Sequence, residues 1–549
     1  MKTMNLIEAK WIPVADGKRL NTRIAPWQIV EGAGLRYTTL AAPRPDFNGA
    51  LAQFLIGLLQ TAFAPEDDKA WRKLWDTPPT PERLRQAFDQ YREAFVLDGD
   101  GPRFMQDLTL QEGEAKPIAG LLMDAPGGNT IRNNQDHFIK RDVVSALCSN
   151  CAAMALFSLQ TNAPSGGQGH RVGLRGGGPL STLLFPRDFE LGLWHLLWLN
   201  ILPNDQFPAA GSNRGKVFPW LAPTLTSEKN QKITPQQADA LQMYWGMPRR
   251  VRLAFAANEG HCDICGAHGD CLVTDYITKN FGASYEGWQH VLSPHSRESA
   301  ETAPLPLHGQ PGGIGFRHWT GVVVSDEEGK SRGSRQPARI LSYHKSSFDR
   351  RAISADLWAF GYDMDNMKAR AWVDSRMPLL LAAPERQEAF EALSKGYVSA
   401  AGEAFGYLRS MAKAAFYGEP SQTGGKLNWG YPPHVPKDGT FYDTLANDYW
   451  RRGESGFFEH LRKALECVDA AQEQVVAESW LSVLGQLVLQ CFDAAVKSVE
   501  NSDGRVKAVV FARAQLKRMM FGDALRGLLG LPQREQKTEK SGKGKKRGR

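Results

Sequence analysis

Two Cys-x-x-Cys pairs, far apart in the chain, constrain the fold more than any other feature. Cys148 and Cys151 lie in LCSNC, and Cys262 and Cys265 lie in HCDICG. Each spacing lets two thiolates face one centre, and four thiolates satisfy a tetrahedral Zn²⁺ ion. A shared ion would also stabilise the fold by closing a long loop. The pairs therefore predict one structural site with Zn²⁺ as its cofactor.

Three other interpretations of these cysteines stay open on the residues alone. Cys148 directly precedes an apolar helical stretch, where a redox pair would have an activated thiolate. A local site could use Cys262, Cys265, His268 and Cys271, although their intervals of two residues are tight for a closed tetrahedron. All four paired cysteines could instead serve only in packing.

The positive charge of the chain is concentrated at its end. The formal net charge is +7, and residues 534–549 hold eight Lys/Arg and two Glu, so this stretch accounts for six of the seven charges. The body is nearly neutral, unlike a protein that coats DNA with a basic domain. Residues 533–549 contain no apolar residue and are expected to be disordered, either solvated or in non-specific contact with phosphates.

Targeting features do not stand out in the sequence. No stretch reaches the roughly 18 uninterrupted apolar residues of a membrane span, and the N-terminal MKTMNLIEAKWIPV lacks the apolar region of a secretory signal. A cytoplasmic location is therefore expected, where disulfides are disfavoured.

Hydrophobic patterning predicts an α+β chain of two domains. Dense apolar residues predict helices over 46–64 and 189–203, Thr80 and Pro81 predict a helix start, and residues 250–375 mix short β-like runs with turns. Four long segments rich in Ala, Leu, Glu, Lys and Arg follow, at 384–416, 443–467, 471–499 and 505–529. We expect a mixed α/β domain with the zinc site over 1–380, a four-helix bundle over 381–532 and a basic tail over 533–549.

A glycine-rich stretch, NAPSGGQGHRVGLRGGG at 162–178, lies between these features. It matches no P-loop, and it follows a helix, unlike the dinucleotide fingerprint. It predicts either a flexible loop or a backbone that approaches a groove or phosphate closely, flanked by Arg171 and Arg175. The chain also lacks His-Glu-x-x-His, Gly-x-Ser-x-Gly and EF-hand patterns, so no enzymatic activity is expected.

Five motifs, taken in order, resemble the CasA family, the large subunit of the type I-E CRISPR Cascade complex. They are NLIEAKWIPV, LCSNC, the glycine-rich stretch, HCDICG and LWAFGYDMDNMKARAWVDSR. The resemblance implies a non-catalytic subunit that recognises a protospacer-adjacent motif (PAM) through the minor groove of double-stranded DNA. It also implies that the subunit helps to open the duplex for guide RNA pairing and recruits a separate helicase-nuclease. The implied partners are CasC, the CasB dimer, CasD, CasE, the guide RNA, target DNA and the helicase-nuclease.

The resemblance also implies roles for individual residues. The four paired cysteines match the family's zinc ligands. Ser165 and Gln168 replace glycines of the family's loop facing the minor groove, so close approach rests on Gly166, Gly167 and Gly169. Lys279 is the lysine nearest to the family's lysine finger.

Two further loops depart from the family pattern or extend it. The family's glutamine wedge should lie in YDMDNMKAR, which has no glutamine, so Asn366, Met367 or Lys368 would have to serve. An apolar Met367 can wedge between base pairs, with Asn366 beside it. Asn134, Phe138 and Lys140 lie where the family has a loop directed at the guide RNA and the backbone subunit.

Two other classes of function remain alternatives. A zinc-stapled scaffold would bind only proteins, so substitutions at Lys279 or Met367 would leave DNA affinity unchanged. A zinc-dependent nuclease would cut DNA unaided when divalent metal is present.

Overall fold

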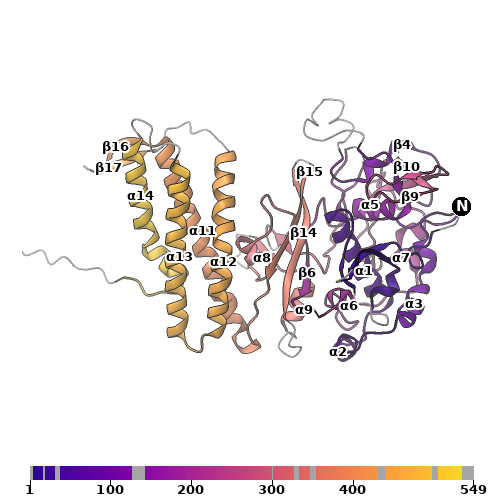
Figure 1. Ribbon diagram of the computed structural model, residues 1–549, viewed down its shortest axis with the longest axis horizontal. Coiled ribbons are helices and arrows are strands. Elements are labelled where there is room, and N and C mark those ends of the chain that lie inside the picture. The colour runs from indigo at the N-terminus through magenta and orange to yellow at the C-terminus, as the bar shows by residue number, and fades with distance from the viewer. Residues whose placement is uncertain are drawn as a thin grey trace, which may run out of the picture. The chain divides into compact units, whose positions relative to one another are not determined.

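The structure is a computed structural model whose described residues form two compact units (Figure 1). Unit 1 comprises Met1–Ile314 and Thr320–Leu379, and unit 2 comprises Gly315–Trp319 and Leu380–Arg549. The described residues are 4–16, 19–30, 37–125, 143–167, 169–188, 190–299, 301–326, 333–346, 354–365, 367–423, 426–430, 439–497 and 505–534. Asn134, Phe138, Lys140, Asn366 and nearly all of the basic tail lie outside them.

Helix α1 (Pro45–Ala62) is the centre of the unit 1 core and confirms the helix expected there. Pro45 begins the helix with a preset φ, and Asp46 places a carboxylate in the first turn. All but three of its 18 residues are buried. The Phe54 ring makes edge-to-face contacts, at centroid distances of 5.2 to 5.9 Å, with Trp11, Phe95, Phe104, Phe157 and Trp245.

Shorter helices surround this core, and one of them is shorter than expected. The helix predicted over 189–203 extends only over Leu193–Trp198, as α6. Asn200 explains the early end, because its side chain bonds the backbone of Leu184 in both directions and caps the carbonyl of Leu196. Thr80 caps α3 as expected, by accepting from the Arg83 N–H. The other helices of unit 1 are α2 (Asp68–Asp76), α3 (Pro81–Asp89), α5 (Ser149–Asn162), α7 (Arg214–Val217) and α9 (Arg339–Lys345).

Four small antiparallel sheets and one hairpin complete the described part of unit 1. In β2-β1-β3 the strands are Arg19–Ile24, Ile12–Asp16 and Tyr37–Leu40. In β12-β11-β13 they are Leu305–Pro306, His295–Arg297 and Ser334–Gln336. Around β10 (Leu272–Lys279) lie β4 (Glu114–Pro117), β5 (Leu147–Cys148) and β7 (Arg250–Ala256). The order β15-β14-β6 joins Lys368–Pro378, Ala355–Asp365 and Ser181–Pro186, and the hairpin pairs β8 (Gly260–His261) with β9 (His268–Gly269).

Unit 2 is a bundle of four long helices, which confirms the expected C-terminal architecture. They are α11 (Gln387–Tyr417), α12 (Gly439–Glu466), α13 (Ala470–Val496) and α14 (Val506–Met520), with the short α15 (Asp523–Leu528) and the β16–β17 hairpin (Glu419–Thr423, Lys426–Gly430). Trp480, Leu484, Leu487 and Cys491 form the buried face of α13. The mixed α+β class is therefore confirmed.

Helix α13 is also the only described helix that is long and apolar enough to cross a membrane by length and composition. Half of its most apolar 18-residue stretch is buried inside the protein. A core helix of a helical bundle passes the same test, and α13 packs in this way against α11, α12 and α14.

Candidate metal centre and nucleic-acid interface

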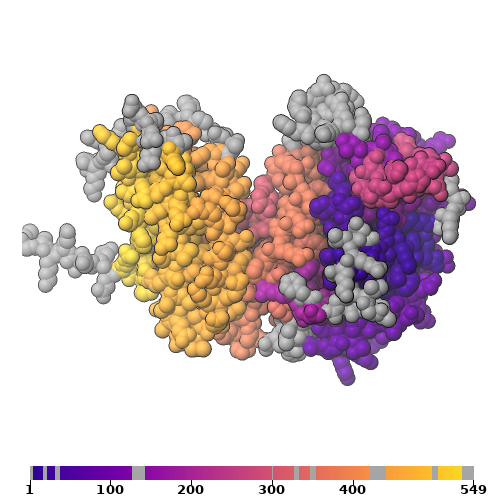
Figure 2. All heavy atoms as spheres, in the orientation of Figure 1, coloured from indigo at the N-terminus to yellow at the C-terminus, as the bar shows by residue number. Residues whose placement is uncertain are grey.

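The structure brings the two Cys-x-x-Cys pairs together in unit 1. Cys148 ends β5, pairs with Leu272 of β10 and precedes the first residue of α5, while Cys151 lies in the first turn of that helix. Cys262 and Cys265 lie in the turn between β8 and β9, and the part of the chain that carries these strands forms part of the surface visible in Figure 2. The Gly266 N–H donates to the Cys262 carbonyl and Gly266 has φ +69°, a tight turn that brings both cysteines to the cluster.

The geometry of the four sulfurs fits a tetrahedral metal ion. All four lie within 4.8 Å of one another, and the Sγ atoms of Cys148 and Cys265 are 3.7 Å apart. A Zn–S bond of about 2.3 Å gives a tetrahedral edge of about 3.8 Å, whereas a disulfide requires about 2.05 Å. Cys148, Cys151, Cys262 and Cys265 could therefore hold a metal ion with little movement.

The local alternative does not form in this arrangement. His268 instead lies with Glu259 and Asp270 in an exposed group, where its Nε2 is 3.3 Å from Glu259 Oε1. Cys271 is outside the four-sulfur cluster. The clustering thus favours a site shared between the two distant pairs.

Hydrogen bonds among the clustered sulfurs shift the pKa values of Cys262 and Cys151 in opposite directions. Hydrogen bonds from Cys148 and Cys151 lower the pKa of Cys262 well below its usual value, and hydrogen bonding to Cys148 and Cys262, together with burial, raises the pKa of Cys151. Four neighbouring thiolates repel one another unless a cation compensates them. The Arg23 guanidinium lies 3.5 Å from Cys265 Sγ and supplies part of that charge.

Asp263, which the sequence analysis missed, ties the two cysteine segments together. Its Oδ2 accepts hydrogen bonds from the backbone N–H of Ser145 (2.7 Å) and Ala146 (2.8 Å) and from the Ser145 hydroxyl. Its own N–H donates to the Ala146 carbonyl. In the sequence, Asp263 stands out only by its position between the two cysteines of HCDICG. A position in a turn does not reveal a hydrogen-bond partner 117 residues away.

The glycine loop, Ser165–Gly169, packs against Arg249. A Cβ at Gly166 would lie 2.7 Å from Arg249 Nη1 and 2.9 Å from His170 Cβ, so the loop is closely packed there. The amide of Gln160, at the end of α5, bonds both the N–H and the carbonyl of Arg249. At Gly167, which has φ +87°, a Cβ would meet nothing within 4 Å.

The glycine loop also contacts the segment that follows Lys279. A Cβ at Gly169 would lie 2.6 Å from the Phe281 nitrogen, and the Gly282 N–H donates to the Gly169 carbonyl. Lys279 is exposed at the end of β10, in register with Arg250. Two of the regions that the sequence pointed to are therefore neighbours in space.

Arg171 and Arg175, expected to flank the loop, are both engaged inside unit 1. Arg171 Nε donates to the Ser227 hydroxyl, and Ser227 in turn bonds the Phe281 carbonyl through its N–H. Arg175 is buried. Arg175 therefore does not present its charge to an external phosphate.

The β14–β15 hairpin carries the remaining expected residues. Met367 is 56% exposed at the tip with φ +68°, and Lys368 begins β15 as an exposed residue. The part of β14 next to the turn contacts the end of the glycine-rich stretch, since a Cβ at Gly178 would lie 2.7 Å from the Tyr362 carbonyl oxygen. Tyr362 is close in the chain to the turn of the hairpin, and the segment that it contacts also carries the glycine loop.

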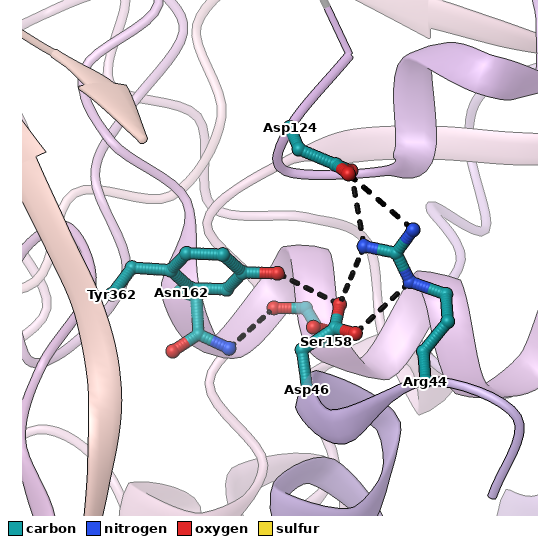
Figure 3. Close-up of polar contacts among 6 residues, drawn as sticks. All are labelled: Arg44, Asp46, Asp124, Ser158, Asn162 and Tyr362. Carbon is teal, nitrogen blue, oxygen red and sulfur yellow. Dashed lines mark hydrogen bonds and ion pairs between the residues drawn. The ribbon is translucent and has the colours of Figure 1, made fainter. Parts of the chain in front are cut away.

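A partly buried polar network connects Tyr362 of β14 to the start of α1 (Figure 3). The Tyr362 hydroxyl donates to Asp46 Oδ2 at 2.7 Å, and Arg44 bridges Asp46 and Asp124. Burial and the Asp46 carboxylate raise the pKa of Tyr362, so the phenol stays protonated and continues to donate. The network fixes the direction in which the hairpin leaves the core.

Comparisons with known proteins agree with this architecture. The sequence model of the family described as CRISPR-associated protein Cse1 matches residues 5–491. Thermus thermophilus CasA (Cse1) superposes with a TM-score of 0.67 at 17% identity, over 95% of this chain and 99% of that one. Cse1 from Acidimicrobium ferrooxidans gives 0.67 at 17% identity over 96% and 99%. A chain from a structure of a CRISPR RNA-guided surveillance complex gives 0.62 at 15% identity over 94% and 99%.

At these identities the superpositions show a shared fold, and the family match, which spans most of the chain, shows descent. The expected resemblance is therefore confirmed. The chain belongs to the Cse1 (CasA) family of CRISPR-associated proteins.

Proposed function

We propose that this protein is the large, non-catalytic subunit of a type I-E Cascade complex and reads the PAM of double-stranded DNA. Membership of the Cse1 family and the likeness to a chain of an RNA-guided surveillance complex support this proposal. In such a complex the guide RNA reads most of the target, so the protein needs only a few placed loops. A nearly neutral body with local contacts is sufficient.

One observation carries the proposal. The glycine loop is hydrogen-bonded to the segment after Lys279, and the same glycine-rich stretch contacts Tyr362 in the strand that leads to Met367. Gly167 would offer its backbone to the minor groove, and Lys279 would reach a base edge or phosphate. Met367, with Asn366 and Lys368, would wedge open the first base pair.

The cysteine cluster would hold a structural Zn²⁺ ion. Four sulfur ligands leave no open position for a water or substrate, as in structural rather than catalytic zinc sites. The proposed partners are CasB, CasC, CasD, CasE, the guide RNA and a separate helicase-nuclease that performs the cleavage. The protein would act in the cytoplasm, where these partners and invading DNA meet.

A titration of the reconstituted RNA-guided complex on targets with every possible adjacent motif tests the proposal. We expect Lys279→Ala and Met367→Ala each to weaken motif-dependent binding by about tenfold or more, since each removes a contact of roughly 1–3 kcal/mol. Lys73→Ala, at an exposed lysine of α2, is the matched control and should bind like the wild type. Unchanged affinity for both loop variants would favour a scaffold that binds only proteins.

Two simpler experiments address the remaining alternatives. A complex assembled without this chain should lose motif-dependent target binding, and retained binding would overturn the proposal. The purified protein with divalent metal should leave DNA intact, whereas cleavage that follows zinc content would favour the nuclease.

A further inference from the structure

Arg175 is a buried cation to which the described residues offer no carboxylate partner. Its residue is 4% exposed, and its guanidinium donates to the hydroxyls of Ser181 (2.8 Å) and Ser293 (3.0 Å) and to Gln53 Oε1. All three acceptors are neutral, and no ion pair to Arg175 occurs among the described residues. Burial lowers the pKa of Arg175 to about 9, so the side chain remains charged at neutral pH. A buried, uncompensated charge is costly, and proteins normally pair it.

A small cavity adjoins this charge. Its volume is about 20 Å³, and its walls include Gln53, Arg175, Tyr244 and His290. Because this is the space open to the centre of a water-sized sphere, the cavity admits one small guest such as a water molecule or a monatomic ion. The walls come from α1, the glycine-rich stretch and the 3₁₀ helix η5 (Ala240–Tyr244), so a guest would contact several distant segments.

The cavity presents hydrogen-bond donors to a guest. The Tyr244 hydroxyl is buried and has no hydrogen-bond partner within the described part of the chain. His290 Nδ1 accepts a hydrogen bond from the Leu292 N–H at 3.1 Å. The neutral ring therefore carries its proton on Nε2, which can only donate a hydrogen bond to a guest. Burial, with the Arg175 charge, lowers the pKa of His290 and keeps the ring neutral.

The oxygens of both side-chain amides in the cavity wall, Gln53 and Gln160, are already occupied. Gln53 Oε1 accepts from both Arg175 and Ser181. Gln160, another wall residue, uses its carbonyl for the Arg249 N–H and its amide for two backbone carbonyls. A guest therefore meets a positive charge and unused donors.

We propose that this cavity binds a buried halide ion, chloride under ordinary conditions, between the Arg175 guanidinium, the Tyr244 hydroxyl and His290 Nε2. A halide accepts several hydrogen bonds at once and compensates the guanidinium charge. A water molecule would satisfy donors but would leave the charge uncompensated. The ion would bind only the folded state and would stabilise unit 1 by mass action.

Thermal unfolding of the full chain at fixed ionic strength tests this site. Sodium chloride would replace sodium gluconate, an anion too large for the cavity, over a range from zero to 200 mM. The expected result is a saturable rise in Tm of a few degrees, reproduced by bromide. A Tm that does not depend on the halide would overturn the proposal.

Two matched substitutions locate the effect. Tyr244→Phe removes only the donor hydroxyl and should weaken the halide dependence by about tenfold or more in midpoint concentration. Tyr397→Phe removes another buried hydroxyl without a partner, in unit 2, and should leave the dependence intact. Equal halide dependence in the wild type and Tyr244→Phe would place the ion elsewhere and overturn the assignment.

Crystals grown in bromide provide the direct observation. An anomalous bromine peak within contact distance of Arg175 and Tyr244 supports the site. Density for a water only, without an anomalous peak, overturns it whatever the melting data show.

Discussion

At the scale of single residues, Gly167 differs from the other glycines of its loop. Gly166 and Gly169 are closely packed inside the protein, because a Cβ would lie 2.7 Å from Arg249 Nη1 at the first and 2.6 Å from the Phe281 nitrogen at the second. At Gly167 a Cβ meets nothing, and only the positive φ of +87° disfavours another residue. The open space above Gly167 is therefore where an external backbone or base edge can approach.

We expect Gly167→Ala to reduce motif-dependent DNA binding by about tenfold or more while it costs the free protein only about 1 kcal/mol. The added methyl group would occupy the space that the DNA needs. DNA titration of the reconstituted complex and thermal unfolding of the free chain measure the two effects.

Gly287→Ala is the matched control for this prediction. Gly287 also has a positive φ, +75°, and also faces open space. Gly287→Ala should therefore introduce the same backbone strain without a loss of DNA affinity. Equal losses of affinity in both variants would contradict a special role for Gly167.

A second residue-scale prediction concerns His344 on α9. The side chain is fully buried, and its Nε2 donates to the Leu199 carbonyl at 2.7 Å. Burial lowers its pKa to about 4, whereas an unfolded chain has the ordinary value of about 6.5. Between these values the unfolded state binds a proton that the folded state does not, so stability is full above about pH 6.5 and falls as the pH drops towards 4.

His344→Gln keeps a donor for Leu199 but does not titrate. The difference between the folded and unfolded pKa values of His344 corresponds to roughly 3 kcal/mol. Between pH 7 and 4 the free energy of unfolding of the wild type should therefore fall by about that much more than that of the variant. Urea unfolding at several pH values measures the difference. Parallel pH profiles for the two proteins would refute it.

At the scale of elements, α5 and β10 connect the cysteine cluster to the candidate DNA loops. Helix α5 starts at Cys148 and leads to the glycine loop, and β10 starts beside Cys148 and ends at Lys279. With rises of 1.5 Å per helical residue and 3.3 Å per strand residue, both run for about 20–25 Å. The cluster and the loops therefore lie at opposite ends of two neighbouring rigid elements.

Cys262→Ser should consequently affect metal content and DNA binding together. We expect zinc per chain to fall from about one to well below one, and motif-dependent binding by the complex to weaken, because the starts of α5 and β10 lose their common anchor. Metal analysis and DNA titration on the same preparations measure both quantities.

Cys271→Ser is the matched control, since Cys271 follows the β8–β9 hairpin but lies outside the four-sulfur cluster. It should keep full zinc and full affinity. Full zinc in Cys262→Ser would contradict the shared site, and zinc loss with unchanged DNA binding would contradict the coupling along α5 and β10.

The elements also show what a sequence can predict. The spacing within each cysteine pair is local, and α1, α3 and the four bundle helices have strong local patterns, so all of them were predictable. The early end of α6 depends on hydrogen bonds between the Asn200 side chain and Leu184 of β6. The position of Arg249 depends on hydrogen bonds between its backbone and the Gln160 side chain. These are contacts between distant residues, and no local pattern encodes them.

At the scale of the whole molecule, a short segment that interrupts the sequence of unit 1, Gly315–Trp319, belongs to unit 2 and lies in its core. Phe316 and Trp319 are fully buried, and the Phe316 ring lies 4.8 Å from Phe457 and 5.1 Å from Trp450 of α12. Trp319 Nε1–H also donates to the Ser394 hydroxyl of α11. Helical periodicity predicts the four long helices but does not reveal that Gly315–Trp319 completes their core.

Phe316→Ala in the full chain should therefore destabilise the bundle selectively. A buried phenylalanine replaced by alanine costs about 3–5 kcal/mol, so amides of α12 and α13 should exchange hydrogen about 10²–10³ times faster wherever exchange requires opening of the bundle. Amides of α1, whose core is separate, should keep their protection. Phe521→Ala is the control within the same unit, because that ring is 39% exposed and its loss should change exchange little. Hydrogen exchange read peptide by peptide decides the matter: unchanged rates in α12 and α13, or an equal acceleration in α1, would show that residues 315–319 do not stabilise the bundle as its packing indicates.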